Sequence, residues 1–214
     1  MGKAKLIKFA EFDSFSNTFN ADCKNKGTWN QWFGNSNPIV LELACGKGDY
    51  TLGLARLHPN INYIGIDIKG NRLWRGAKTA LEEKLNNVAF LRIPIDNIQD
   101  YFEANEVSEI WITFPDPQPQ KERKRLSSPK FLNEYRKIAK KDALVNVKTD
   151  SDLFYEFTLE IAKEENLDIE VNIPNVYTQA EVSEILNIKT YYETMWLGMG
   201  RTIKYIKYKL NPTR

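Results

Sequence analysis

Histidine and cysteine are scarce in this 214-residue chain, which has one histidine, His58, and two cysteines, Cys23 and Cys45. The cysteines form no CxxC pair and no disulfide framework. We therefore expect no metal site built from clustered cysteine and histidine ligands, and the lack of a cysteine triad argues against radical chemistry on an iron–sulfur cluster. Because His58 precedes Pro59 just after a helical stretch, we interpret it as a surface residue at a helix end.

Long apolar runs and targeting signals are also missing. No segment approaches the ~18 uninterrupted apolar residues of a membrane span, and residues 1–6 lack the apolar core of a signal peptide. Leu6 stands where the N-myristoylation pattern requires Ser or Thr. We therefore expect a cytoplasmic protein without a membrane partner.

The net charge of +2 is too small to indicate a nucleic-acid-binding protein by itself. Local basic clusters can still bind phosphate groups, although most such runs are solvated faces. Two clusters are candidates for phosphate contacts: Lys3, Lys5, Lys8, Lys24 and Lys26 near the start, and Lys121, Arg123, Lys124 and Arg125 further on.

Strand and helix patterns alternate from Pro38 onward, whereas residues 1–37 carry aromatics and asparagines without clean periodicity. The predicted strands cover 39–44, 62–67, 88–93, 109–113, 143–148, 167–173 and 202–210, and the predicted helices cover 49–57, 72–85, 98–102, 130–139 and 152–165. Repeated β-α units with right-handed crossovers give a parallel sheet with helices on both faces. The sequence thus predicts a doubly wound α/β domain at 38–214, with a mostly parallel sheet, and a short N-terminal arm at 1–37 packed on it.

The first predicted strand ends in a glycine-containing loop, Glu42-Leu-Ala-Cys-Gly-Lys-Gly48. Gly46 and Gly48 allow a tight turn and a close approach to a ligand. A dinucleotide loop needs a third glycine, where Thr51 stands, and the carboxylate of Glu42 would repel a pyrophosphate. A cationic ligand suits this acid, and the sulfonium and amino groups of S-adenosylmethionine are both positive.

A second acid, Asp67, ends the second predicted strand. In open α/β sheets an acid at this place can accept hydrogen bonds from ribose hydroxyls, and Ile68 would then lie against the adenine. A glycine loop alone can be merely a tight turn. The loop, Glu42 and Asp67 in combination predict an S-adenosylmethionine site.

The loop after the fourth predicted strand reads Thr113-Phe-Pro-Asp-Pro-Gln-Pro119. Its three prolines preset the backbone and lower the entropy of the free loop. An aspartate between prolines can simply form a turn. Because Asp116 follows a strand that opens toward the reactive end of the cofactor, we favour a functional role.

Four segments together resemble the bacterial tRNA (guanine-N7)-methyltransferase family, in matching order over about residues 38–210. They are Glu42–Gly48, Phe114–Pro117 with its basic tail, Lys148–Asp150, and Thr190–Glu193 with Gly200. The resemblance implies a Rossmann-like class I methyltransferase fold, S-adenosylmethionine as cofactor and 7-methylguanosine in the tRNA variable loop as product. It implies Asp116 at the active site and substrate contacts from Asp150, Thr190 and Glu193. We also expect Gln120 and Lys121 to contact the substrate.

The chain departs from the family pattern at several positions. Ala44 replaces a loop glycine, which is tolerable if its φ is negative, and Gln118 stands where Trp is usual. The basic stretch after the prolines is shortened. Pro94-Ile95-Asp96 replaces the pair that meets adenine, so we expect the backbone N–H of Ile95 to bind the cofactor and Asp96 to have no clear adenine role.

Guanine N7 has an exposed lone pair, so the enzyme mainly aligns the reacting atoms. Asp116 is predicted to stabilise the positive charge that develops on the purine, while Asp150 and Glu193 accept from the guanine N–H groups. Tyr191 and Tyr192 are expected to pack beneath the last strand rather than to stack on the base.

Two alternatives remain open at this stage. One is a methyltransferase of the same fold acting on a small molecule or a protein; the other is a catalytically inactive RNA-binding relative. A dehydrogenase ranks last because of the loop. The oligomeric state, monomer or homodimer, and the preferred tRNA species are not indicated by the sequence.

Overall fold

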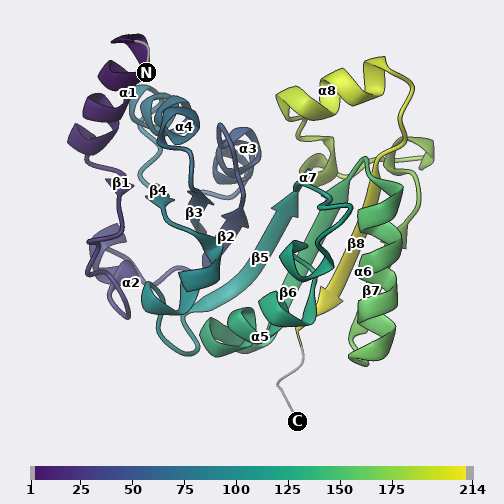
Figure 1. Ribbon diagram of the computed structural model, residues 1–214. Coiled ribbons are helices and arrows are strands. Elements are labelled where there is room, and N and C mark those ends of the chain that lie inside the picture. Colours follow the sequence, from purple (N-terminus) through teal and green to yellow (C-terminus); the bar gives the residue numbers. More distant parts are fainter. Residues whose placement is uncertain (1–2, 211–214) are drawn as a thin grey trace.

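A single eight-stranded sheet forms the centre of the protein, whose computed structural model describes residues 3–210, with side chains from Leu6 onward. The strand order is β1-β4-β3-β2-β5-β6-β8-β7 (Figure 1). Strands β1 to β6 run parallel, and β8 is antiparallel to both of its neighbours. The strands are β1 (Thr18–Phe19), β2 (Ile39–Leu43), β3 (Asn62–Asp67), β4 (Val88–Arg92), β5 (Val107–Thr113), β6 (Ala139–Thr149), β7 (Asp168–Ile173) and β8 (Lys204–Lys209).

Helices cover both faces of this sheet (Figure 1). The α-helices are α1 (Lys3–Ser14), α2 (Trp29–Phe33), α3 (Asp49–Leu57), α4 (Gly70–Glu82), α5 (Pro129–Ile138), α6 (Asp152–Glu164), α7 (Glu184–Asn187) and α8 (Tyr191–Gly198). Short 3-10 helices are η1 (Ile95–Asp100), η2 (Glu122–Lys124) and η3 (Val176–Thr178). None of the helices in residues 3–210 has the length and apolar character needed to cross a membrane.

The alternation of side chains along buried strands produces two hydrophobic clusters. Leu41 and Leu43 of β2 belong to the cluster that includes α5 and α6, whereas Val40 belongs to the cluster on the opposite face with α3 and α4. Strands buried on both sides read as continuous apolar runs, which explains why residues 39–43 are recognisable in the sequence. The predicted doubly wound α/β fold is confirmed.

The N-terminal segment contributes regular structure that its sequence pattern did not predict. Helix α1 packs on α4, and β1 extends the sheet by pairing Thr18 with Phe90 of β4. The amide of buried Asn17 donates to the carbonyl oxygen of Ala77 at 3.1 Å. The predicted arm (1–37) and domain (38–214) each extend into residues outside the described range, 1–2 and 211–214.

Candidate active site at the carboxyl edge of the sheet

Glu42 lies buried beneath the loop that follows β2. Its Oε2 accepts from the backbone N–H of Thr51 at 2.7 Å and from the Thr51 hydroxyl, while Oε1 accepts from the hydroxyl of Thr113 at 2.5 Å. Burial raises the pKa of this carboxyl to about 7, even though these hydrogen bonds oppose the shift. The acid therefore links the ends of β2 and β5 to the start of α3. Thr51, at the place of the missing third glycine, supplies two of its donors.

Asp67, at the end of β3, holds the same loop from the other side. Its Oδ2 accepts from the N–H of Gly46 at 3.0 Å, and its Oδ1 accepts from the N–H of Lys69 at 2.8 Å. Gly46 and Gly48 both have positive φ, 59° and 72°, which glycine adopts without steric cost. A Cβ on Gly48 would meet the ring of Phe90 at 2.5 Å, whereas one on Gly46 would meet nothing within 4 Å. The loop thus packs tightly at Gly48 and borders open space at Gly46.

Ala44 has a φ of 56°. The condition under which the loss of glycine would be tolerable here, a negative φ, is therefore not met. The left-handed conformation costs an L-residue roughly 1–2 kcal/mol, and the turn imposes it because the N–H of Cys45 is bonded to Ile66 of β3 at 3.1 Å.

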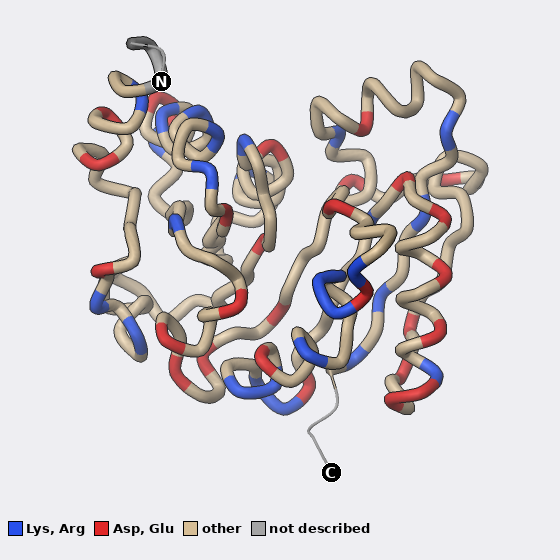
Figure 2. The backbone as a smooth tube through the Cα atoms, in the orientation of Figure 1, with Lys and Arg blue, Asp and Glu red and all other residues tan. Residues whose placement is uncertain are grey.

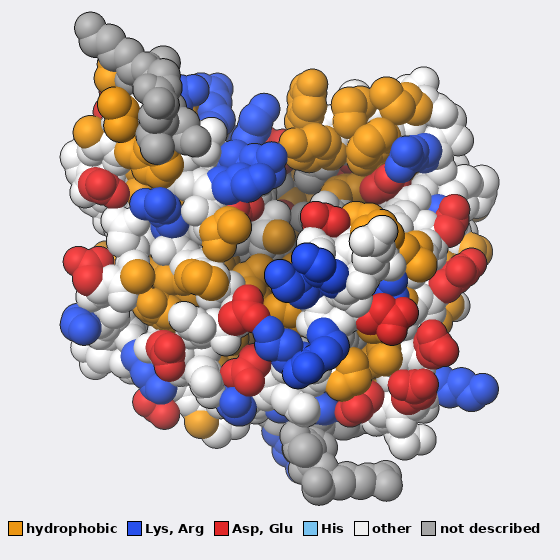
Figure 3. All heavy atoms as spheres, viewed as in Figure 1, with side chains coloured by type: hydrophobic (Ala, Val, Ile, Leu, Met, Phe, Trp, Pro, Cys, Tyr) orange, Lys and Arg blue, Asp and Glu red, His pale blue; other side chains and the backbone are white. Residues whose placement is uncertain are grey.

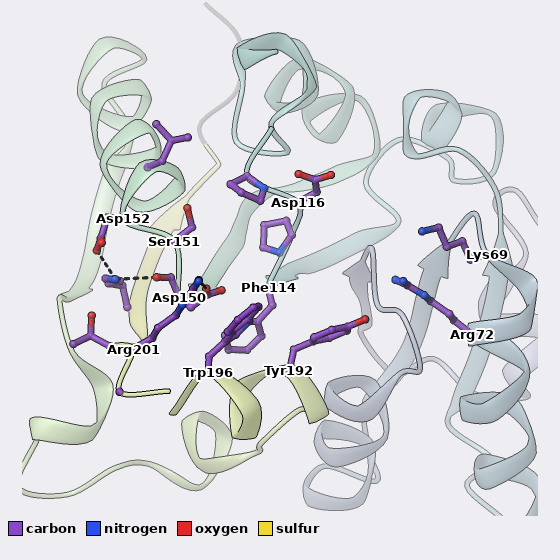
Figure 4. Close-up of a pocket in the computed structure, with 16 residues that line it drawn as sticks. Lys69, Arg72, Phe114, Asp116, Asp150, Ser151, Asp152, Tyr192, Trp196 and Arg201 are labelled. Atoms are coloured by element: carbon purple, nitrogen blue, oxygen red, sulfur yellow. Dashed lines mark hydrogen bonds and ion pairs between the residues drawn. The ribbon is translucent and has the colours of Figure 1, made fainter. Parts of the chain in front are cut away.

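A cleft of about 840 Å³ lies where β5 and β6 end (Figure 4). Asp116 and Asp150, predicted from separate motifs, both line it. Aromatic rings of Phe114, Tyr192 and Trp196 face the same space (Figure 4). Basic side chains complete the lining and come from the start of α4 with the residue before it, and from the start of β8 with the segment before it: Lys69, Arg72, Arg201 and Lys204.

The Pro-Asp-Pro segment leaves the sheet through a strained residue. Phe114 has a φ of 49°, and strain of this kind is concentrated at functional sites. Oδ1 of Asp116 accepts from the N–H of Gln118 at 3.0 Å, forming a turn that places Gln118 at a φ of 46°. The turn uses one carboxylate oxygen and leaves the Asp116 side chain exposed at the cleft. Turn formation and a position at the cleft thus coincide in this residue.

Arg125 does not belong with the phosphate-binding candidates, and this part of the prediction is wrong. Its side chain is 2% exposed and donates to the carbonyl oxygens of Pro117 at 3.1 Å and Pro119 at 3.3 Å. The guanidinium also lies 4.5 Å from the ring centroid of Phe157. Arg125 therefore supports the proline loop from inside the protein, whereas Lys121 and its basic neighbours in η2 are exposed. Figure 2 shows where basic residues lie along the backbone.

Asp150, after β6, pairs with a residue that the sequence pattern does not indicate. Its Oδ2 accepts from Arg201 at 2.6 Å, and the Arg201 guanidinium stacks over Trp196 at 4.1 Å. The side chain of Asp150 is 12% exposed. The carboxylate of Asp150, the guanidinium of Arg201 and the indole of Trp196 thus contact one another in that order along one wall of the cleft.

Thr190 and Glu193 organise the start of α8. The hydroxyl of Thr190 accepts from the N–H of Glu193 at 3.1 Å, which is an N-cap. Glu193 is fully buried, pairs with Lys148 at 2.8 Å and accepts from the hydroxyl of Tyr177 at 2.7 Å. A small pocket lies between the glycine loop and the start of α8, and Thr190 lines this loop pocket together with Gly46, Lys47 and Tyr191. The Glu193 side chain is fully buried behind the wall of the cleft.

Lys148 is the buried cation of this arrangement, and it lies on β6. Besides Glu193, its ammonium donates to the carbonyl oxygens of Leu186 at 2.7 Å and Ile188 at 3.1 Å. Desolvation lowers its pKa to about 8, although Glu193 opposes the shift.

Tyr191 and Tyr192 are 60% and 42% exposed, so the expectation that they pack beneath the last strand is wrong. Their rings meet edge to face at 5.6 Å, and Lys47 of the glycine loop lies 4.7 Å from the Tyr191 ring centroid. Figure 3 shows apolar side chains gathered over α8, close to basic side chains over α4. Together they leave an aromatic surface beside the loop.

The remaining predicted residues lie around this edge. Ile68 is 58% exposed and Ile95 is half-buried at the start of η1, while Asp96 pairs with Lys130 on the surface. Gln120 and Lys121 are exposed further along the proline loop. Within the described residues no group of three or more His, Cys, Asp or Glu side chains is placed to hold a metal ion.

Comparison with known proteins decides the family. Residues 36–206 match the family model described as "Putative methyltransferase". A tRNA (guanine-N(7)-)-methyltransferase of Bacteroides thetaiotaomicron is 47% identical, over 98% of this chain and 87% of that protein. The one from Cytophaga hutchinsonii is 39% identical, over 99% of this chain and all of its own length.

The chain belongs to the tRNA (guanine-N(7)-)-methyltransferase family. The resemblance seen in the four sequence segments is thereby confirmed. Among solved structures, a 16S rRNA methyltransferase, KamB, superposes with a TM-score of 0.67 over 87% of this chain and 94% of its own, at 14% identity. This likeness supports the class I methyltransferase fold of the family.

Proposed function

We propose that this protein transfers a methyl group from S-adenosylmethionine to N7 of a guanine in the variable loop of tRNA. The proposal is carried by one observation: in a chain of this family, Asp116 and Asp150 both line a cleft next to the glycine loop, and Tyr192 and Trp196 line it with them. The names of the relatives supply the guanine N7 and the tRNA.

The acidic residues around the glycine loop fit S-adenosylmethionine. Two carboxylates, Glu42 and Asp67, lie at the ends of adjacent strands, and the open space at Gly46 gives a ligand access to the backbone. Carboxylates favour a ligand that carries a sulfonium and an ammonium group. The residues we assign to the cofactor are Glu42, Gly46, Gly48, Asp67, Ile68, Ile95 and, at its reactive end, Asp116. When bound, this cofactor supplies an electrophilic methyl group.

The cleft residues orient the base. Guanine N7 needs no deprotonation, so alignment and charge stabilisation are the main tasks. Asp116 stabilises the positive charge that develops on the purine, with its orientation set by the Gln118 N–H. Asp150, oriented by Arg201, accepts from the guanine N–H groups, and Tyr192 and Trp196 offer rings for stacking.

Thr190 and Glu193 belong to the site in different ways. Thr190 lines the loop pocket beside Tyr191 and is assigned to the substrate. Glu193 is bonded to Lys148 and Tyr177, and we infer that it acts on the substrate by fixing α8 and its tyrosines.

The exposed basic residues hold the phosphates of tRNA. Lys121, Arg123 and Lys124 in and next to η2, with Gln120 beside them, face solvent, and Lys69 and Arg72 line the cleft. N7 lies in the deep, narrow major groove of an RNA helix, so a loop or a splayed base is the accessible target. Contacts to phosphates make binding sensitive to salt. A tRNA substrate is consistent with a cytoplasmic location.

The test is to incubate the protein with labelled S-adenosylmethionine and unmodified tRNA, and to identify the labelled nucleoside. We expect 7-methylguanosine from the variable loop. Label in another nucleoside, or in small molecules or protein alone, would refute the proposal. If no label is transferred, calorimetry with S-adenosylmethionine distinguishes two explanations. A catalytically inactive relative would bind tRNA but not S-adenosylmethionine, whereas an active enzyme given the wrong tRNA would bind S-adenosylmethionine.

A further inference from the structure

A second recess, of about 460 Å³, lies between the N-terminal segment and the sheet. On the sheet side it is lined by Ile68 after β3, by the basic Arg92 at the end of β4, and by Ile93 and Pro94 after that strand. On the other side it is lined by Asp13, Asn20 and Ala21, which come from the end of α1 and from the residues after β1. The recess therefore requires the N-terminal segment for its outer wall.

Several contacts hold this segment in place. The backbone N–H of Phe90 donates to the carbonyl oxygen of Asn17 at 2.9 Å, and the indole N–H of Trp74 donates to Glu11 at 2.6 Å. The guanidinium of Arg92 lies 4.8 Å from the ring centroid of Phe9. The wall is thus fastened to β4 and α4.

The chemistry of the recess is that of a purine site. Ile68, 58% exposed, offers an apolar surface for a ring, and Asp67 next to it lies where a ribose would bind. The amide Nδ2 of Asn20 donates to Oδ1 of Asp13 at 3.0 Å, which orients both side chains. This bond engages one acceptor and leaves Oδ2 of Asp13 and the amide oxygen of Asn20 as further acceptors.

We propose that Asp13 and Asn20 of the N-terminal segment form part of the cofactor site and recognise the amino group of adenine. This inference rests on the proposed function, since it assumes S-adenosylmethionine as donor. Adenine presents an N–H₂ donor at the position where hypoxanthine presents a carbonyl oxygen. A carboxylate accepts from the former and repels the latter, so the wall discriminates between the two bases.

The experiment is calorimetric binding of S-adenosylhomocysteine and S-inosylhomocysteine to the full-length protein. The variants are Asp13→Ala and Asn20→Ala, and the matched control is Asp22→Ala, which removes an exposed acid of the same segment outside the recess. Thermal unfolding of each variant checks that the fold is retained. We expect the wild type to prefer the adenosyl compound by about 10-fold, because a hydrogen bond to a charged group contributes about 1.5–3 kcal/mol and partial exposure reduces it.

In Asp13→Ala we expect the affinity for S-adenosylhomocysteine to fall about 5- to 10-fold. The ratio of the affinities for S-adenosylhomocysteine and S-inosylhomocysteine should then fall toward one. Asn20→Ala should move both values in the same direction, and Asp22→Ala should match the wild type. Wild-type preference in both variants would overturn the inference while leaving the proposed function intact. Failure of the wild type to bind S-adenosylhomocysteine at all would overturn the proposed cofactor, and the inference with it.

Discussion

The guanidinium of Arg125 holds the backbone carbonyl of Pro117, 3.1 Å away, directly after Asp116. A side chain that belongs by sequence to a basic cluster is therefore a buried support of the loop that carries the acid. Its contact with the ring of Phe157 fixes the plane of the guanidinium. The position of Asp116 depends on this fork-shaped donor.

Replacing Arg125 with Lys keeps the charge but removes the planar fork. We expect kcat to fall about 10- to 100-fold with little change in the affinity for tRNA, because misplacement of about 1 Å in an aligned site has effects of this size. Steady-state kinetics and tRNA binding measure the two quantities. In the control Lys124→Ala, exposed and next in sequence, tRNA affinity should fall and the salt slope should decrease by about one. If Arg125→Lys behaved like that control, Arg125 would be a phosphate ligand.

Glu42 gives the protein without cofactor a defined pH dependence. Its pKa is about 7 in the folded protein, against an ordinary value of 4.5. Between these pH values the folded state binds more protons than the unfolded state, so the free energy of unfolding decreases as pH rises, by up to about 3 kcal/mol. Glu42→Gln should lack this decrease. Urea denaturation of both proteins at pH 5, 6 and 7 provides the measurement, and parallel curves would contradict the burial of an ionisable Glu42.

The strained Ala44 is a site where glycine should stabilise the protein. Removing the Cβ relieves the positive φ, and the gain exceeds the extra entropy of glycine in the unfolded chain by about 0.5–1 kcal/mol. Ala10→Gly, in helix α1, should instead lower the free energy of unfolding by about 1 kcal/mol. Chemical denaturation compares the two. A loss of stability in Ala44→Gly would show that the turn does not strain this residue.

Lys148 and Glu193 form a fully buried ion pair between β6 and α8. Lys148→Met leaves the buried Glu193 carboxylate without its cation, with only the Tyr177 hydroxyl as a donor, and leaves two carbonyl oxygens without the ammonium, so we expect a loss of about 3–5 kcal/mol in the free energy of unfolding. Adding Glu193→Leu removes the unpaired charge and should restore part of it. A double-mutant cycle from urea denaturation measures the coupling. Additive losses would mean that the two groups do not stabilise each other.

The elements that the sequence predicts correctly are those with local signals. Strands β2 to β6 each contain a short apolar run. Because the carboxyl ends of parallel strands meet at one edge, the sequence alone places Asp116 and Asp150 at the same edge of the sheet. The acids Glu42 and Asp67 are recognisable because each lies at or near the end of such a strand. Local pattern and fold topology are sufficient for these residues.

The features that the sequence does not reveal depend on contacts between distant parts of the chain. Glu193 and Lys148 are 45 residues apart, and nothing in either motif indicates that they pair. The exposure of Tyr191 and Tyr192 follows from how α8 is held above the sheet, and the burial of Arg125 follows from the fold of the shortened loop. The order of the N-terminal segment comes from its pairing with β4 rather than from its own periodicity.

The most direct test of the account is the rate of methyl transfer to tRNA by Asp116→Asn in a single turnover at saturating S-adenosylmethionine. The amide oxygen of Asn still accepts from the N–H of Gln118, so the turn is retained and only the negative charge is lost. We predict a rate reduced by about 100-fold or more even when the cofactor is saturating, whereas Asp142→Asn at the opposite end of β6 keeps the wild-type rate. Transfer by Asp116→Asn at the wild-type rate would contradict the assignment of Asp116 as the charge-stabilising group.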